Sequence, residues 1–201
     1  MPTEQLDVAA RRGRPRSEAA ESHAAIMDAV YELLQETSAR DLTMDAIARR
    51  AKVGKPTLYK WWPSKAALVF EMFHQRIAGD VPPPLDGTAE DVIRAKMRRL
   101  VRAFNGLFGK VMADLIAEGQ SDADVLHELY ERHMRPRTEA TIADVERGIA
   151  AGDFAPTTDA ALLVAAIVGP IYFRLLMRHA PMTEEFVDAL VDQVLAGARP
   201  R

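Results

Sequence analysis

Apolar residues recur at helical spacing along most of this chain, and this periodicity limits its fold more than any other feature. One stripe runs through Ile26, Val30 and Leu34, and similar spacing returns in residues 44–51 and 68–77. Apolar residues three and four positions apart share one face of an α-helix. No sustained alternation of apolar and polar residues, the pattern of a half-buried strand, occurs along the sequence. We therefore expect an all-α fold of about nine helices.

Consecutive prolines within residues 79–87 divide the chain, because an internal proline interrupts a helix. We expect a flexible basic arm over residues 1–20, a first domain over residues 21–79 and a second domain over residues 80–201. Residues with short oxygen-bearing side chains, which cap helix N-termini, precede several apolar stretches. The expected N-caps are Thr43, Ser64, Thr88 (with Asp91 in a capping box), Ser121 (with Asp124), Thr157 or Thr158, and Thr183.

Composition excludes several classes of protein. The absence of cysteine excludes disulfides and thiolate metal sites, and it fits a reducing cytoplasm. The first residues lack the apolar segment of a secretory signal. The apolar run at 160–173 contains Gly169 and Pro170 and is shorter than a bilayer requires, so it predicts a buried core helix. We expect a cytoplasmic protein without membrane contact.

Positive charge is concentrated near the N-terminus. Residues 11–65 carry eleven Lys and Arg against seven Asp and Glu, whereas residues 66–201 carry fifteen against twenty. This asymmetry indicates that the N-terminal part meets a polyanion. The basic part contains two short predicted helices, residues 44–51 and 55–62, joined by about three residues, which is the spacing of a helix-turn-helix. The second helix of such a unit enters the major groove of DNA.

The second short helix has two kinds of side chain on different faces. Leu58 and Trp62, four residues apart, are expected to face inward and hold the helix in place. Side chains that bind phosphate oxygens and base edges occupy its other positions. These outward residues are Lys55, Thr57, Tyr59 and Lys60, and Lys65 follows at the start of the next helix, where it could reach a phosphate.

The stretch "LTMDAIARRAKVGKPTLYKWWPSKAALV" at 42–69 resembles the DNA-binding signature of the tetracycline-repressor (TetR) family of bacterial transcription regulators, above all in "TLY..WPSK..L". The resemblance covers residues 22–73. It implies a homodimeric repressor that a small molecule releases from its operator. By this resemblance the residues at DNA-contacting positions are Thr43, Lys55, Thr57, Tyr59, Lys60 and Lys65. We also expect DNA contacts from Pro56 and Trp61, which lie on the same short helix. Two residues depart from the family pattern: Lys52 stands where glycine is common in the turn, and Gly54 stands where a capping serine is common.

The segment "RRGRPR" at 11–16 contains four arginines, a glycine and a proline. It is not expected to be helical. Beside a DNA-binding unit, such a segment serves as an arm that follows the backbone or enters the minor groove. We expect Arg14 and Arg16 to make these contacts; the alternative is a solvated, disordered terminus.

The second domain contains large apolar and aromatic side chains that suit an adaptable pocket for a large apolar ligand. The resemblance implies an effector pocket between its helices. The candidate lining residues are Met97, Phe104, Phe108, Met112, Tyr130, His133, Phe173 and Met177. The alternative is that these residues only pack the core. An effector in this pocket would act by displacing the helix at 64–78, which carries Lys65.

The apolar residues of the last helix, at 186–195, together with those at 160–173, exceed what one small domain needs to bury. A four-helix interface in a two-fold dimer would use both segments. Two recognition helices would then lie about 34–36 Å apart, one turn of DNA.

Enzyme classes find little support in the sequence. Glu71 and His74 form one Glu-x-x-His pair, whereas a carboxylate-bridged di-iron bundle needs two such pairs. His127 and His133 are six residues apart and lie on different helix faces. We expect no catalysis, no metal and no cofactor. The alternative function from another class is a helical small-molecule-binding or scaffold protein without operator recognition.

Overall fold

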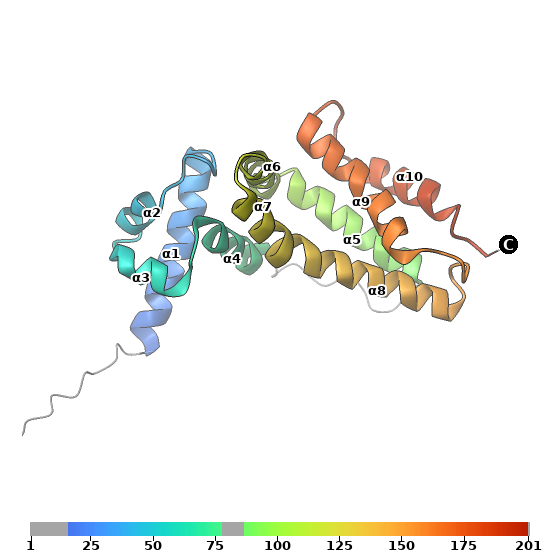
Figure 1. Cartoon of the computed structure of the whole chain (residues 1–201), viewed down its shortest axis with the longest axis horizontal. Coiled ribbons are helices and arrows are strands. Elements are labelled where there is room, and N and C mark those ends of the chain that lie inside the picture. The colour runs from blue at the N-terminus through green and yellow to red at the C-terminus, as the bar shows by residue number, and fades with distance from the viewer. Residues whose placement is uncertain (1–15, 78–86, 201) are drawn as a thin grey trace, which may run out of the picture.

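The computed structural model describes residues 16–77 and 87–200, and all its regular elements are helical, as predicted (Figure 1). The first group of helices, which we call the head, comprises α1 (Arg16–Glu36), α2 (Met44–Arg50), α3 (Lys55–Trp61) and α4 (Lys65–Ile77). The second group, the body, comprises α5 (Ala89–Phe104), α6 (Leu107–Gly119), α7 (Ala123–Leu129), η1 (Tyr130–Met134), α8 (Arg135–Ala151), α9 (Ala160–Met177) and α10 (Glu184–Leu195). Since α7, η1 and α8 form one uninterrupted rod, the described residues contain nine helices.

The expected basic arm is shorter than predicted at its C-terminal end. Helix α1 begins at Arg16, so residues 16–20, which the sequence assigned to the arm, belong to the first helix. The alanines and glutamates that follow Arg16 form helices readily, which accounts for the earlier start. Residues 1–15, and the proline-rich segment 78–86, lie outside the described residues.

Most predicted N-caps are confirmed by their hydrogen bonds. Thr43, Thr88 and Thr183 accept backbone N–H groups at the starts of α2, α5 and α10, and Ser64 accepts the N–H of Ala67. Thr88 and Asp91 form the predicted capping box.

Two N-cap predictions were wrong by one or two residues. Asp122, not Ser121, caps α7, and Asp159, not Thr157 or Thr158, caps α9. Aspartate caps as well as serine or threonine does, so adjacent polar residues compete and the pattern alone cannot choose between them.

The α7–η1–α8 rod contains a wide turn in its middle. The backbone N–H of Arg135 bonds to the carbonyl of Tyr130, five residues back, instead of four. Pro136 follows at once, and a proline has no N–H and clashes with the carbonyl four residues before it. The wide turn therefore removes a conflict that a regular α-helix would contain.

Helix α9 is not the buried core helix that was predicted. Leu163, Ile167 and Ile171 are buried, but Leu162, Phe173 and Met177 on another face are 67%, 57% and 62% exposed. The helix contains 18 residues, and by length and composition alone it is long and apolar enough to cross a membrane. The sequence underestimated its length because Pro170 lies inside the helix and does not end it.

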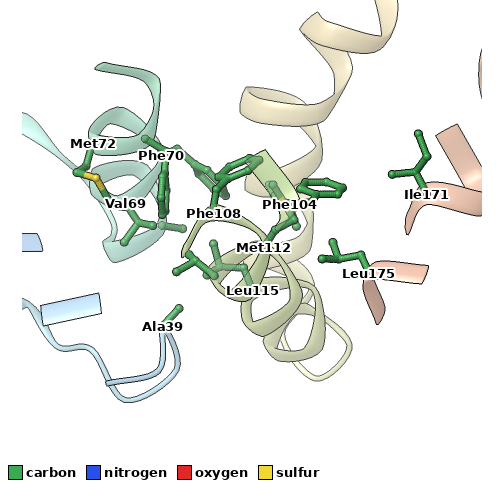
Figure 2. Packing of buried hydrophobic residues seen from close by; sticks show 14 of the residues in the cluster. Ala39, Val69, Phe70, Met72, Phe104, Phe108, Met112, Leu115, Ile171 and Leu175 are labelled. Carbon is green, nitrogen blue, oxygen red and sulfur yellow. The ribbon is translucent and has the colours of Figure 1, made fainter. Parts of the chain in front are cut away.

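One apolar core joins the head to the body (Figure 2). In Figure 2, Val69, Phe70 and Met72 of α4 lie beside Phe108, Met112 and Leu115 of α6, and the packing continues to Phe104 and on to Ile171 and Leu175 of α9. The rings of Phe73 and Phe108 pack edge to face, with 5.1 Å between their centroids. Helix α4 thus belongs to both groups, and its movement would disturb both.

Candidate nucleic-acid interface and effector cavity

The turn between α2 and α3 has the backbone geometry of a helix-turn-helix. Lys52 adopts a left-handed conformation with φ of 55°, which costs about 1–2 kcal/mol for a residue other than glycine. Gly54 is the N-cap of α3 and offers no side-chain hydrogen bond. Lys52 in the turn and Gly54 at the N-cap therefore lie where the sequence analysis placed them.

Leu58 and Trp62 hold α3 against the head, as predicted. Both side chains are buried. The indole Nε1–H of Trp62 donates to Oε2 of Glu71 in α4 at 2.5 Å, and the other oxygen of Glu71 lies 2.8 Å from Nε2 of His23 in α1. Glu71, the acid of the Glu-x-x-His pair, thus joins α1, α4 and the end of α3. This network fixes how far α3 projects from the head.

The opposite face of α3 is open. Lys55, Pro56, Tyr59 and Lys60 are exposed, Tyr59 to 50%, and Thr57 is half-buried. The ammonium of Lys55 pairs with Asp45 at 2.9 Å, a contact that raises the pKa of Lys55. An exposed ion pair of this kind contributes little to stability, so a phosphate could replace Asp45 at little cost.

Thr43 and Trp61 stand at the edges of this face. Thr43 is exposed, although its hydroxyl already accepts the N–H of Ala46 as a helix cap. Trp61 is 40% exposed, and its ring lies 5.2 Å from His23 and 5.6 Å from Trp62. Much of the Trp61 ring therefore packs on the head. Arg14 lies outside the described residues, and Arg16 is the first residue of α1.

Lys65 differs from the other candidate contacts because it is bonded to the body. Its ammonium lies 3.3 Å from both carboxylate oxygens of Glu118 in α6 and donates to the carbonyl of Arg40 at 3.2 Å. The neighbouring Ser64 donates to Glu128 of α7 at 2.5 Å. Two body carboxylates therefore hold the N-terminus of α4. The sequence analysis missed both links, because contacts more than fifty residues apart leave no local pattern.

A cavity of about 300 Å³ lies where α4, α5, α6, η1 and α8 meet. Three of the candidate effector residues, Met97, Phe108 and His133, line it. The other lining residues are Phe73, His74, Lys96, Arg99, Leu100, Ala103, Arg137, Ala140 and Thr141. The wall therefore includes α4 of the head as well as four elements of the body.

The remaining candidate effector residues do not line this cavity. Phe104 and Met112 are buried in the core, and the Phe104 ring packs against Phe108 and against Tyr172 of α9. Tyr130, Phe173 and Met177 are exposed on the surface. Residue type identified aromatic and methionine side chains, but it did not show which neighbouring helix each one faces.

The cavity disfavours additional positive charge. Burial, with the nearby charges of Arg137 and His74, lowers the pKa of His133 to about 3, so its imidazole is neutral at physiological pH. The His133 ring stacks on Phe70 of α4 at 4.9 Å. Partial burial, which disfavours the charged guanidinium, also lowers the pKa of Arg137. The sequence analysis did not single out Lys96, Arg99 or Arg137; the four-residue spacing of His133 and Arg137 was the available signal.

Comparison with known proteins matches both groups of helices. Residues 26–72 match the family described as bacterial regulatory proteins, tetR family, and residues 83–194 match the tetracyclin repressor-like C-terminal domain. An uncharacterized HTH-type transcriptional regulator, YdeS of Bacillus subtilis, is 34% identical over 94% of this chain and 94% of its own. The DNA-binding transcriptional repressor TetR of Mycobacteroides abscessus is 27% identical over 92% and 94%. The crystal structure of the TetR family regulator SCO0332 superposes with a TM-score of 0.74 and 30% identity, over 90% of this chain and 100% of that one.

Proposed function

Because this chain belongs to the TetR family of helix-turn-helix transcriptional regulators, we propose that it is a cytoplasmic repressor that binds an operator as a homodimer and releases it when a small molecule enters the body. Ligand-responsive repression is the known behaviour of this family. In this proposal the head is the DNA-binding domain, and the body is the effector-binding and dimerisation domain. The observation that carries it is the open face of α3, with Lys55, Tyr59 and Lys60 projecting from a helix that Leu58 and Trp62 hold in place.

Helix α3 would enter the major groove, with Lys55, Thr57, Tyr59 and Lys60 toward phosphates and base edges. Each protomer would make three or four phosphate contacts. With counterion release, the logarithm of the binding constant should fall against the logarithm of salt concentration with a slope of about −5 to −7. Fluorescence anisotropy with DNA from upstream of the gene tests this slope. No binding, or a slope near zero, would favour a helical ligand-binding or scaffold protein instead.

The exposed face of α9 supports the homodimer. Its large apolar side chains, including Leu162, Phe173 and Met177, form a surface that a monomer in water would not leave uncovered. A second copy related by a two-fold axis would cover it with the same face. It would also present two copies of α3 to successive major grooves, about 34–36 Å apart.

The double substitution Leu162→Asp and Phe173→Asp tests this interface by light scattering. Burying four carboxylates per dimer is unfavourable, so the variant should be monomeric and bind operator DNA weakly. Tyr59→Asp is the matched control, because it also places a carboxylate on an exposed aromatic or apolar site; it should remain dimeric and lose only DNA binding. A dimeric double variant, or a monomer that binds lipid vesicles through α9, would contradict the proposed interface.

Helix α4 is the proposed route from the effector to DNA. Phe73 and His74, near its C-terminal end, line the cavity, and Ser64 and Lys65, at its N-terminal end, bond to Glu128 and Glu118. A ligand that binds one position of α4 better than another will shift the population of both ends together. A displacement of one or two ångströms would then change the separation of the two heads.

A further inference from the structure

We infer that the effector is an amphipathic organic anion of modest size, an aromatic or medium-chain carboxylate, whose carboxylate binds Arg137 and whose apolar part lies against Phe73, Met97 and Phe108. This inference rests on the proposed function, because it names the ligand of the proposed effector cavity. It refines the purely apolar ligand that the sequence predicted.

The charge of the cavity wall is one-sided. Lys96, Arg99 and Arg137 line the cavity, and none of its lining residues in the described part of the chain is an aspartate or a glutamate. The ammonium of Lys96 pairs with Asp144, which also accepts from Arg147 at 2.5 Å. Asp144 is buried and already has two cationic partners, so it is not placed to neutralise the other arginines. Among the described residues, the side chains that line the cavity therefore include cations and no anion.

Arg137 is the cation whose charge lacks a compensating group. Its Nη1 donates to the carbonyl of His133 at 2.8 Å and lies 3.0 Å from Nδ1 of the same residue. Both acceptors are neutral, since His133 is uncharged at physiological pH. Among the described residues no carboxylate pairs with the guanidinium within 4.0 Å, and the hydrogen bonds there use only Nη1. The side chain is partly exposed, so its Nε and Nη2 are open to a ligand.

The free donors of Arg137 match one ligand group. A guanidinium presents parallel N–H groups that a carboxylate accepts as a pair, in a contact stronger than one between neutral groups. The pKa of Arg137 is already lowered by its surroundings, so an anion beside it would relieve an unfavourable environment. A cationic ligand would meet the like charge of Arg137, and a neutral ligand could not form a charge-assisted pair with these donors.

The rest of the cavity is apolar and small. Phe73, Met97, Leu100 and Phe108 supply most of the apolar wall, on the side formed by α4, α5 and α6. Its volume of about 300 Å³ is at the lower end of the roughly 300–1,000 Å³ of small-molecule sites. One ring system or a medium-length alkyl chain fits this space, and the ligand would touch Phe73 of α4 directly.

Matched pairs of ligands that differ in charge test the inference. Decanoate and decanamide, and 2-naphthoate and 2-naphthamide, are titrated into the full chain, without DNA, by isothermal calorimetry and thermal unfolding. We expect at least one carboxylate to bind about tenfold or more tightly than its amide, as loss of a charge-assisted hydrogen bond would give. Arg137→Met, which keeps length but removes the charge, should abolish this preference, and Arg137→Lys should restore part of it.

Arg135→Met is the matched control, because Arg135 lies on the same rod but does not line the cavity and is paired with Glu131. It should leave the preference unchanged. Equal binding of acid and amide, no binding by either carboxylate, or a preference that survives Arg137→Met would overturn the inference. A separate DNA-binding assay with the same carboxylate tests the proposed function: tight, Arg137-dependent binding that leaves operator affinity unchanged supports the ligand class and contradicts the repressor mechanism.

Discussion

The head and the body place their candidate functional side chains in opposite directions. In the head, Lys55, Tyr59 and Lys60 project outward from one short helix, and two buried residues, Leu58 and Trp62, fix their position. In the body, four elements, together with α4 of the head, turn side chains inward around one cavity. An outward surface depends on few supports, so its contacts can change without loss of stability. A cavity shares its wall with the core, so binding and stability are coupled there.

The largest expected effect tests whether α3 depends on its buried supports. Leu58→Ala removes a fully buried side chain and should destabilise the chain by about 2–5 kcal/mol, with loss of DNA binding. Urea unfolding at pH 7 measures the change. Leu126→Ala, at an exposed position of α7 outside the proposed interface, is a control for the same chemical change. If Leu58→Ala lost less than about 1 kcal/mol, α3 would not be anchored as described.

The outward face should show the reverse behaviour. Lys55→Ala should weaken binding to the operator by about 1–3 kcal/mol and relax the preference at one base pair, while the free energy of unfolding changes by less than about 0.5 kcal/mol. Competition with operators mutated at single positions measures the preference. Equal losses on every sequence would make Lys55 a phosphate contact instead.

Buried His133, which lines the cavity, should make the stability of the chain depend on pH. His133 is neutral in the folded chain down to pH about 3, whereas an unfolded histidine takes up a proton near pH 6.5. Because the unfolded state binds more protons between these values, stability should fall as pH decreases below 6.5, by about 1.4 kcal/mol per pH unit from this group. Urea unfolding from pH 7 to 5 measures it. His133→Gln should flatten the dependence; His127→Gln, at an exposed site on the same rod, should not.

The smallest effect concerns the link between the two regions. Glu118→Gln weakens the ion pair with Lys65, which is worth about 0.2–1 kcal/mol. Release of Lys65 should raise operator affinity about two- to fivefold and reduce the response to effector, because α4 loses one of its bonds to the body. Glu131→Gln removes an exposed carboxylate from a surface ion pair and controls for the charge change. Unchanged operator affinity would show that the Lys65 pair does not restrain DNA binding.

The two regions also differ in what their sequence revealed. Leu58 and Trp62 could be placed inward because their four-residue spacing and the short turn before them are local features. Phe104, Met112, Tyr130, Phe173 and Met177 were grouped by residue type, but the structure divides them between core and surface. Their environment depends on which helices pack together. This packing joins segments that are distant in the sequence, so no local spacing of residues predicts it.

The fold class and most N-caps could be predicted for the same reason, since periodicity and capping are local. The bonds of Ser64 and Lys65 to the body, and the position of Arg137 at the cavity, depend on α4 and α8 meeting in three dimensions. The outer face of α9 was predicted to contribute to a dimer, yet its helix was also expected to be core. An apolar stripe in the sequence shows that a helix face is to be covered. It does not show whether the same chain or a second copy covers that face.

The wide turn at η1 determines which face of the α7–η1–α8 rod is buried before and after it. Leu129, before it, and Val145, after it, are sixteen positions apart and are both fully buried. At about 100° per residue, an unbroken α-helix would rotate them about 160° apart, whereas absorbing one residue reduces the offset to about 60°. The extra residue thus changes the rotational position of the second half of the rod, so that both halves turn a buried face toward the core. Deleting a single residue there should rotate one half of the rod and expose its buried side chains to water.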